Sequence, residues 1–333
     1  MSEVMSAPPA PVETVPEVAG ALEPLRTPFR LTVVIPARNE AASIGRVLAQ
    51  VRAQLPDAEL LVVDDASTDD TAALAAAAGA RVIRQPYNKG NGAAVKAGLR
   101  AARGEVVLLL DADSQHDPAD IPRVLEPVGP YDLVVAARSR ASNASLARGW
   151  GNWALNRHGT YLTGVHIADL TSGFRVMKRD RIMEFIHLLP NAYSYPTTST
   201  LAFIKAGYSV KFVPVRARER VGGRSAQRLL QNGIRFGIII LKMITLFSPL
   251  KIFSPLSLLL FLVGGAYAVY TAITQHHITN SSVLLITTSI VIFLMGLISE
   301  QIAALRFERS QMTSDERRAT SDEALIPPPA HYP

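Results

Sequence analysis

The chain has 333 residues, 48% of them hydrophobic, and contains no cysteine, so disulfides, thiolate metal sites and cysteine nucleophiles are excluded. The formal net charge of +6 is compatible with nucleic acid, a membrane surface or a phosphate-bearing substrate. Aromatic residues are sparse and are not interleaved with basic ones in the first half, so no nucleic acid is expected as a partner.

Residues 1–28 are predicted to form a disordered tail, because they are rich in proline and almost free of aromatic residues. This segment lacks the basic start and apolar core of a signal peptide. We therefore expect the N-terminus to stay in the cytoplasm.

Short apolar segments alternate with helical patterns over the next hundred residues. The segments that favour strands lie at 31–35, 60–63, 81–83, 105–110 and 132–137. The helices expected between them run from Ser43 to Gln54, over about 70–78 and over 93–103. This alternation predicts parallel βαβ units with right-handed crossovers. A further strand at 211–215 contains a proline and is expected at the sheet edge.

Polar segments follow three of these strands, at Pro36–Glu40, Asp64–Asp70 and Asp111–Gln115. In open parallel sheets, ligands bind beyond the carboxyl ends of the strands. The three segments therefore predict one binding site at this edge.

The segment Asp111-Ala112-Asp113-Ser114-Gln115-His116 is a candidate metal site. Alternate residues of an extended chain point the same way, so Asp111, Asp113 and Gln115 can converge. Their hard oxygen donors suit Mg²⁺ or Mn²⁺ rather than zinc, with water and substrate phosphates as the remaining ligands. A strand-end turn with solvated carboxylates is the open alternative.

The last third of the chain has the hydrophobic patterns of a membrane-associated segment. Residues 226–247 form an amphipathic helical pattern that suits a membrane interface, although an ordinary core helix has the same pattern. Residues 252–273 and 282–305 are long and apolar enough to span a bilayer, with two buried core helices as the alternative. The connector has no Lys or Arg, whereas both flanks do, which predicts cytoplasmic termini. The charged tail after about 310 is expected to be disordered.

Five ordered motifs together carry a resemblance to a known family. They lie at Val34–Glu40, Val63–Asp69, Asn88–Ala94, Asp111–His116 and Thr171–Arg175. The chain resembles the family 2 glycosyltransferases of GT-A fold, and within them the polyprenyl-phosphate group of dolichyl-phosphate mannosyl- and glucosyltransferases. The paired C-terminal spans resemble those of the bacterial members.

The resemblance implies an α/β fold with a Rossmann-like, mostly parallel sheet, followed by an interfacial helix and two transmembrane helices. The expected units are a tail at 1–28, a GT-A domain at 29–225, a juxtamembrane helix at 226–250, a hairpin at 251–306 and a disordered tail at 307–333. The membrane would be the inner (cell) membrane, with the catalytic domain and both termini cytoplasmic. A homo-oligomer is left open.

The resemblance also implies roles for individual residues. Those expected to bind the nucleotide-sugar are Pro36, Arg38, Glu40, Val63, Asp65, Lys89, Asp111, Ala112, Asp113 and Arg138. The expected metal ligands are Asp111, Asp113 and Gln115, and those expected to bind acceptor or phosphate are Arg138, Ser172, Arg175, Arg220, Arg224 and Ser225. The expected catalytic set is Asp111, Asp113, Asp169 and Arg220.

Asp169 is interpreted as a residue that positions the acceptor or acts through its charge. An acceptor phosphate is already anionic, so it needs no strong base, and a turn-capping role for Asp169 is the alternative. The family often has a lysine where this chain has Ala226, so Arg224 and Arg228 are the candidate substitutes.

The sequence thus predicts an inverting transferase that moves a hexose from GDP-mannose or a UDP-hexose to a polyprenyl phosphate, with Mg²⁺ or Mn²⁺. A glycosyltransferase with a glycolipid or polysaccharide acceptor, a membrane-bound nucleotidyltransferase and a catalytically silent scaffold are the alternatives. A Rossmann dehydrogenase is disfavoured, because Pro36–Glu40 stands where its glycine-rich turn belongs.

Overall fold

A computed structural model of the chain describes residues 25–112, 116–138, 146–191, 194–215 and 247–323. Six predicted site or substitute residues therefore lie outside the described residues: Asp113, Gln115, Arg220, Arg224, Ser225 and Arg228. The tail at 1–24 and the amphipathic helix predicted at 226–247, apart from its last residue, also lie outside them.

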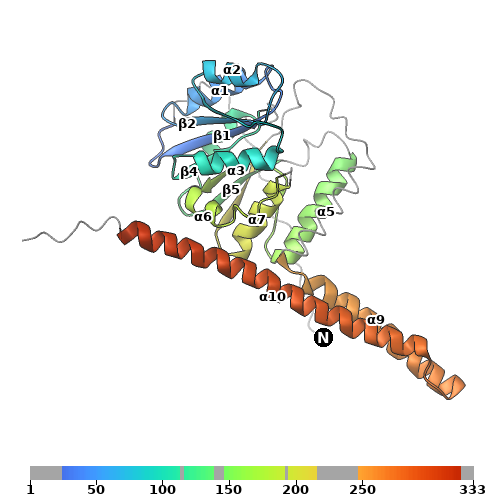
Figure 1. The fold of residues 1–333 in the computed structure, drawn as a ribbon. Coiled ribbons are helices and arrows are strands. Elements are labelled where there is room, and N and C mark those ends of the chain that lie inside the picture. Colours follow the sequence, from blue (N-terminus) through green and yellow to red (C-terminus); the bar gives the residue numbers. More distant parts are fainter. Residues whose placement is uncertain (1–24, 113–115, 139–145, 192–193, 216–246, 324–333) are drawn as a thin grey trace, which may run out of the picture.

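One seven-stranded sheet forms the centre of the described N-terminal part (Figure 1). The strands are β1 Leu31–Ala37, β2 Glu59–Asp64, β3 Arg81–Arg84, β4 Val106–Leu109, β5 Leu133–Arg138, β6 Arg175–Lys178 and β7 Val210–Val215. Their order is β3-β2-β1-β4-β6-β5-β7, and β6 is antiparallel to both its neighbours while the other pairs are parallel. The mostly parallel α/β sheet is confirmed, as is the edge position of β7.

Helices pack on both faces of this sheet. They are α1 Ile44–Gln54, α2 Thr71–Ala77, α3 Asn91–Ala101, the short 3-10 turn η1 Pro118–Asp120 with α4 Ile121–Leu125, α5 Leu146–Thr163, α6 Arg179–Glu184 and α7 Tyr195–Lys205. The helices expected between the first four strands are confirmed as α1, α2 and α3. The strand β6 and the helices α5 and α7 were not predicted.

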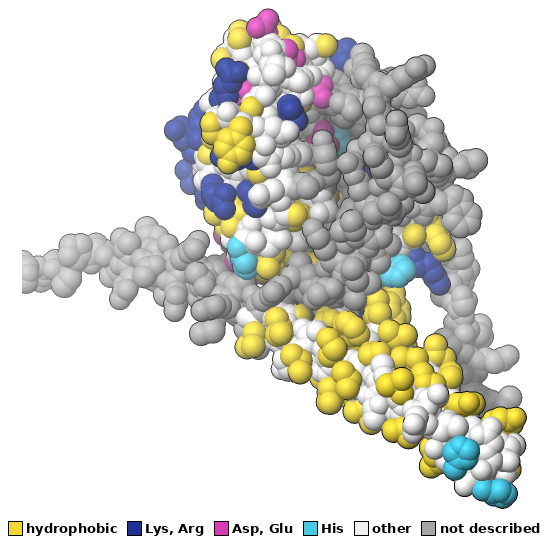
Figure 2. Space-filling model, turned by 45° about the vertical axis from the view of Figure 1, so that its right-hand side comes forward, with side chains coloured by type: hydrophobic (Ala, Val, Ile, Leu, Met, Phe, Trp, Pro, Cys, Tyr) yellow, Lys and Arg dark blue, Asp and Glu magenta, His cyan; other side chains and the backbone are white. Residues whose placement is uncertain are grey.

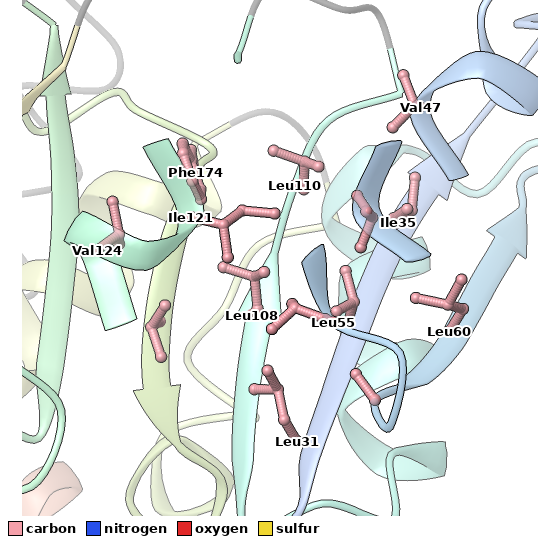
Figure 3. Packing of buried hydrophobic residues seen from close by; sticks show 14 of the residues in the cluster. Leu31, Ile35, Val47, Leu55, Leu60, Leu108, Leu110, Ile121, Val124 and Phe174 are labelled. Carbon is pink, nitrogen blue, oxygen red and sulfur yellow. The ribbon is translucent and has the colours of Figure 1, made fainter. Parts of the chain in front are cut away.

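The core has two layers, one on each face of the sheet, because the side chains of successive residues in each central strand point to opposite faces. Val33 and Ile35 of β1 pack with Leu108 and with α1 on one side, whereas Val34 packs with α3 on the other. Figure 3 shows the first layer, where Ile35 lies near Val47 of α1 and Leu108 lies beside Ile121 of α4. Such packing holds the strand ends at fixed positions, which a site built from their loops needs.

The C-terminal part is a helical hairpin of α9 Leu250–Gln275 and α10 Asn280–Glu323 that projects from the sheet domain (Figure 1). Within the described residues, Leu250–Gln275 and Asn280–Leu305 are long and apolar enough to cross a membrane. Figure 2 shows hydrophobic side chains covering the hairpin, with Lys and Arg on the sheet domain. Gly264 lets the helices approach, since a Cβ there would lie 2.9 Å from the Cβ of Leu285.

The helix α10 overlaps part of the tail predicted from the sequence. Residues 307–323 were expected to be disordered, yet α10 continues to Glu323. This stretch contains no Gly or Pro, and the prolines that suggested disorder begin only at Pro327. Nothing in the segment itself therefore stops a helix that the apolar part of α10 has already started.

Candidate active site

The loops that follow β1 and β2 are bonded to each other at the sheet edge. Asn39 has a left-handed backbone (φ 56°), and its side-chain Oδ1 accepts the backbone N–H of Thr68 at 2.8 Å. In return, the Asn39 N–H donates to Ser67 Oγ at 3.0 Å, and the Glu40 N–H donates to Thr71 Oγ1 at 2.8 Å. The segments Pro36–Glu40 and Asp64–Asp70 therefore lie side by side, as predicted.

Asp65 connects this pair to a third loop. Its buried carboxylate accepts the backbone N–H groups of Lys89 at 2.7 Å and Gly90 at 2.9 Å. These bonds fix the loop that leads into α3. The expected contact of Asp65 with a nucleotide base stays a prediction.

The other residues expected around the nucleotide lie along the same edge. Pro36 and Val63 are register partners on β1 and β2 and are buried, as is Ala112. Arg38 is exposed, and Glu40 is partly exposed and accepts the Ser43 hydroxyl at 3.0 Å. The structure thus brings these residues to one edge, but their contacts with a donor remain predictions.

Asp111 lies just beyond β4, opposite the loop that leads into β6. The antiparallel register pairs Leu109 with Arg175, and two further residues along each chain place Asp111 opposite Gly173. A Cβ on Gly173 would lie 2.8 Å from Asp111 Cγ and would overlap a carboxylate oxygen. Only glycine therefore leaves room for this carboxylate, whose side chain is 31% exposed.

His116 is the neighbour of Asp111 on its buried side. Its Nε2 lies 3.8 Å from Asp111 Oδ2, and its ring centroid lies 5.4 Å from that of Phe174. Burial, followed by the positive charge of Arg138, lowers the pKa of His116 to about 4. A neutral imidazole thus stands beside Asp111. His116 ends the motif Asp111–His116, and no role was predicted for it.

The second charged group of the site is the ion pair between Arg138 and Asp169. Arg138 Nε donates to Asp169 Oδ2 at 2.8 Å, and its Nη2 donates to Oδ1 at 3.1 Å and to the Thr171 hydroxyl. Burial alone would raise the pKa of Asp169, but the hydrogen bond and charge of Arg138 outweigh it and hold the pKa below its ordinary value. Asp169 is therefore ionised at neutral pH.

Arg175 and Ser172 are fully buried, although both were expected to contact phosphate. The Arg175 guanidinium donates to the Ser172 carbonyl, to the Pro196 carbonyl at 2.8 Å and to Ser199 Oγ at 2.8 Å. These contacts favour a structural role for Arg175, which ties the loop before β6 to the first turn of α7. Its phosphate contact remains an untested prediction.

A divalent metal was predicted at Asp111, Asp113 and Gln115, of which only Asp111 is described. The described residues contain no group of three or more His, Asp or Glu side chains that could hold a metal ion. The carboxylate of Asp111 is nevertheless the hard oxygen donor that Mg²⁺ and Mn²⁺ prefer. The part of the predicted set that can be seen fits such an ion.

Comparisons with known proteins agree with this geometry. The model of "Glycosyl transferase family 2" matches residues 32–185, and that of "GtrB C-terminal hairpin" matches residues 248–305. An undecaprenyl-phosphate mannosyltransferase of Micrococcus luteus is 30% identical, over 59% of this chain and 87% of its own. A polyprenol monophosphomannose synthase of Mycolicibacterium smegmatis is 32% identical, over 60% of this chain and 82% of its own.

Solved structures of glucosyl-3-phosphoglycerate synthase from Mycobacterium tuberculosis share the fold. The complex with Mn²⁺, UDP-glucose and phosphoglyceric acid has a TM-score of 0.54 at 22% identity, covering 66% of this chain and 79% of that one. The complex with Mn²⁺ and UDP-glucose has a TM-score of 0.50 at 25% identity, with the same coverage. The GT-A fold expected from the sequence is thereby confirmed.

Proposed function

This chain belongs to the family 2 glycosyltransferases, and we propose that it transfers a hexose from a nucleotide-sugar to the phosphate of a polyprenyl lipid at a membrane. The names of two relatives, an undecaprenyl-phosphate mannosyltransferase and a polyprenol monophosphomannose synthase, support this acceptor class. GDP-mannose and UDP-hexoses are the proposed donors, and a solved structure of similar fold binds UDP-glucose.

The observation that carries the proposal is the position of β6. Because β6 runs antiparallel between β4 and β5, the loop before it reaches both strand ends. Gly173 in this loop meets Asp111 after β4, and Thr171 meets Arg138 at the end of β5. Asp111 was predicted on the donor side, and Arg138 was predicted to contact both donor and acceptor. With Arg138 assigned to the acceptor, the two sides meet at one loop.

The proposed reaction is a single displacement. An oxygen of the acceptor phosphate bonds to the anomeric carbon while the bond from that carbon to the nucleoside diphosphate breaks, so the configuration inverts. The acceptor oxygen is already anionic, and no proton has to be removed. Asp169, ionised and paired, holds Arg138 by two hydrogen bonds, and the guanidinium offers positive charge to a phosphate at the rim.

Asp111 would hold a Mg²⁺ or Mn²⁺ ion, together with the predicted ligands Asp113 and Gln115. Such an ion, when bound, neutralises charge on a leaving diphosphate. Gly173 leaves the space that the Asp111 carboxylate occupies, and His116 packs against the buried side of that carboxylate as a neutral group.

The test is an assay of the full chain in lipid vesicles with radiolabelled GDP-mannose, UDP-glucose and UDP-galactose. With one donor, label should pass into the lipid fraction only when polyprenyl phosphate is present, and nucleoside diphosphate should be released in equal amount. Release of pyrophosphate would indicate a nucleotidyltransferase. Label that enters a glycolipid without added polyprenyl phosphate would overturn the proposed acceptor.

The same assay tests the metal. Chelation with EDTA should abolish transfer, and Mg²⁺ or Mn²⁺ should restore it, because without a cation the Asp111 carboxylate would repel the anionic diphosphate. Full activity in EDTA would contradict the metal proposal.

The hairpin is proposed to span the inner membrane with the sheet domain and both termini in the cytoplasm. The chain has no cysteine, so single cysteines report topology directly. In intact cells, a membrane-impermeant maleimide should label His277→Cys in the connector between α9 and α10 and should not label Gly45→Cys on α1. The reverse pattern would contradict the orientation.

A further inference from the structure

The helix α5 lies outside the motifs identified in the sequence, yet it is hydrogen-bonded to the loop that carries Asp169. Asn156, in the middle of α5, donates from Nδ2 to the Ala168 carbonyl at 2.7 Å and accepts the Leu170 N–H on Oδ1 at 3.0 Å. Its single amide group thus binds the backbone on both sides of Asp169. A partly exposed asparagine that uses both ends of its amide in this way fixes a loop.

Two neighbouring contacts hold the same loop. The Ile167 N–H donates to Thr160 Oγ1 at 3.1 Å, again from α5, and Thr197 Oγ1 of α7 donates to the Leu170 carbonyl at 3.3 Å. Asp169 itself carries the ion pair with Arg138. The position of this ion pair therefore depends on where α5 stands.

The far end of α5 is held by the membrane hairpin. The carbonyls of the last helical turn have no partner within the helix, so a cation or donor placed there is stabilising. Lys251, in the first turn of α9, donates from Nζ to the carbonyls of Leu162 at 2.7 Å and Tyr161 at 3.2 Å. The start of α9 is tied in turn to α10, because the Leu250 N–H donates to Glu300 at 3.1 Å.

Figure 1 shows the resulting arrangement, in which α5 extends from the site end of the sheet domain toward the start of the hairpin. We propose that α5 is a positioning element for the acceptor. Asn156 sets the Arg138–Asp169 pair, and Lys251 fixes α5 at a set height above the membrane. This inference rests on the proposed function, in which that pair faces a lipid phosphate.

The experiment measures transfer rates of the full chain in vesicles while each substrate is varied in turn. Asn156→Asp replaces the donating amide by an oxygen of the same size that repels the Ala168 carbonyl. Loss of this hydrogen bond, with repulsion added, should raise the KM for polyprenyl phosphate about tenfold. The KM for the nucleotide-sugar should change less than about twofold. Arg157→Ala, at the exposed neighbouring position, is the matched control and should change neither.

A merely structural role for Asn156 gives a different result. In that case both KM values rise together, or kcat falls with the fraction of folded enzyme, and either outcome overturns the inference. If Asn156→Asp does not fold, Lys251→Met tests the other end of α5, since it keeps the length of the side chain and removes its charge. We expect it to raise the acceptor KM about threefold, the effect of roughly 0.7 kcal/mol.

Hydrogen exchange separates this inference from the proposed function. Asn156→Asp and Lys251→Met should accelerate exchange at residues 167–171, whereas Arg157→Ala should not. This result does not depend on the substrate. If the wild-type chain does not use polyprenyl phosphate as an acceptor, the proposed function fails, but the exchange data still test whether α5 holds the loop at 167–171. If exchange at 167–171 is the same in all variants, the positioning role of α5 fails while the proposed function stands.

Discussion

The loops on the two sides of Asp111 are held in place by different contacts. On the proposed donor side, loops after β1, β2 and β3 bond directly to one another at the sheet edge, through Asn39 and Asp65. On the proposed acceptor side, the Arg138–Asp169 pair depends on α5, which depends on Lys251 of the hairpin. The proposed donor side is thus completed within the sheet domain, whereas the proposed acceptor side is held in place by contacts with the helical hairpin.

The junction between the two sides should be the most sensitive point. In Gly173→Ala the new Cβ would displace the Asp111 carboxylate, because the two would overlap. A shift of about 1 Å in a reacting geometry costs on the order of 100-fold in rate, so we expect a loss of about 100-fold in kcat.

Gly45→Ala is the control for this substitution. A Cβ at Gly45 on α1 would have no atom within 4 Å. The activity of Gly45→Ala should therefore stay within about twofold of the wild-type activity. Equal activity of the two variants would mean that Gly173 does not define the position of Asp111.

The buried ion pair on the acceptor side should matter for stability. Arg138→Ala leaves the Asp169 carboxylate, 7% exposed, without its main partner. Because the Arg138 side chain is itself 27% exposed, we expect a loss of about 2 kcal/mol in the free energy of unfolding, below the range for fully buried pairs. Thermal unfolding of the full chain in detergent, followed by circular dichroism, measures the change.

The exposed pair between Arg30 and Glu105 provides the comparison. Its side chains are 77% and 60% exposed, so Arg30→Ala should cost less than about 1 kcal/mol. If both substitutions cost the same, Asp169 is better solvated than the structure indicates.

The pH dependence of stability follows from the same pair. The pKa of Asp169 lies below its ordinary value of 3.8, so the pair stabilises the fold above pH 3.8 and the effect is lost as the pH falls further through the lowered pKa. The difference in melting temperature between wild type and Asp169→Asn should therefore be constant at neutral pH and shrink below about pH 4. A difference that grows on acidification would contradict the assigned direction.

The smallest effect is expected at the outer contact between the sheet domain and the hairpin. Lys205 of α7 lies 3.9 Å from Glu300 of α10, and the two side chains are 41% and 30% exposed. Lys205→Ala should lower the free energy of unfolding by less than about 1 kcal/mol and leave the acceptor KM unchanged. A tenfold rise in that KM would show that α7, and not α5, transmits the position of the hairpin.

The contrast between the two sides also explains which parts of the site could be predicted from the sequence. Asp64, Asp65 and Asp111 follow clear apolar strands, so the meeting of their loops at one edge followed from the parallel pattern alone. β6 has only four residues and begins at Arg175, a charged residue whose burial depends on the Pro196 carbonyl and the Ser199 hydroxyl of α7. No local pattern predicts such a strand, and the Gly173 contact with Asp111 could not be expected without it.

The helix α5 was missed for a similar reason. Its residues Gly149, Gly151 and Gly159 weaken the helical signal, and its apolar positions do not form a clear stripe. What holds α5 in place are contacts from far along the chain, such as Lys251 at its C-terminal end. The motif Thr171–Arg175 indicated a site, but its connection to the helical hairpin required the structure.

The most direct test of the division between the two sides is a comparison of two isosteric variants in one assay. Asp65→Asn replaces an oxygen that accepts a backbone N–H in the donor-side loops, and Asp169→Asn removes the charge that holds Arg138. With both substrates varied, we expect Asp65→Asn to raise only the KM for the nucleotide-sugar and Asp169→Asn to raise only the KM for polyprenyl phosphate. If each variant raises both values, or if the two effects are exchanged, the donor and acceptor do not bind on separate sides of Asp111.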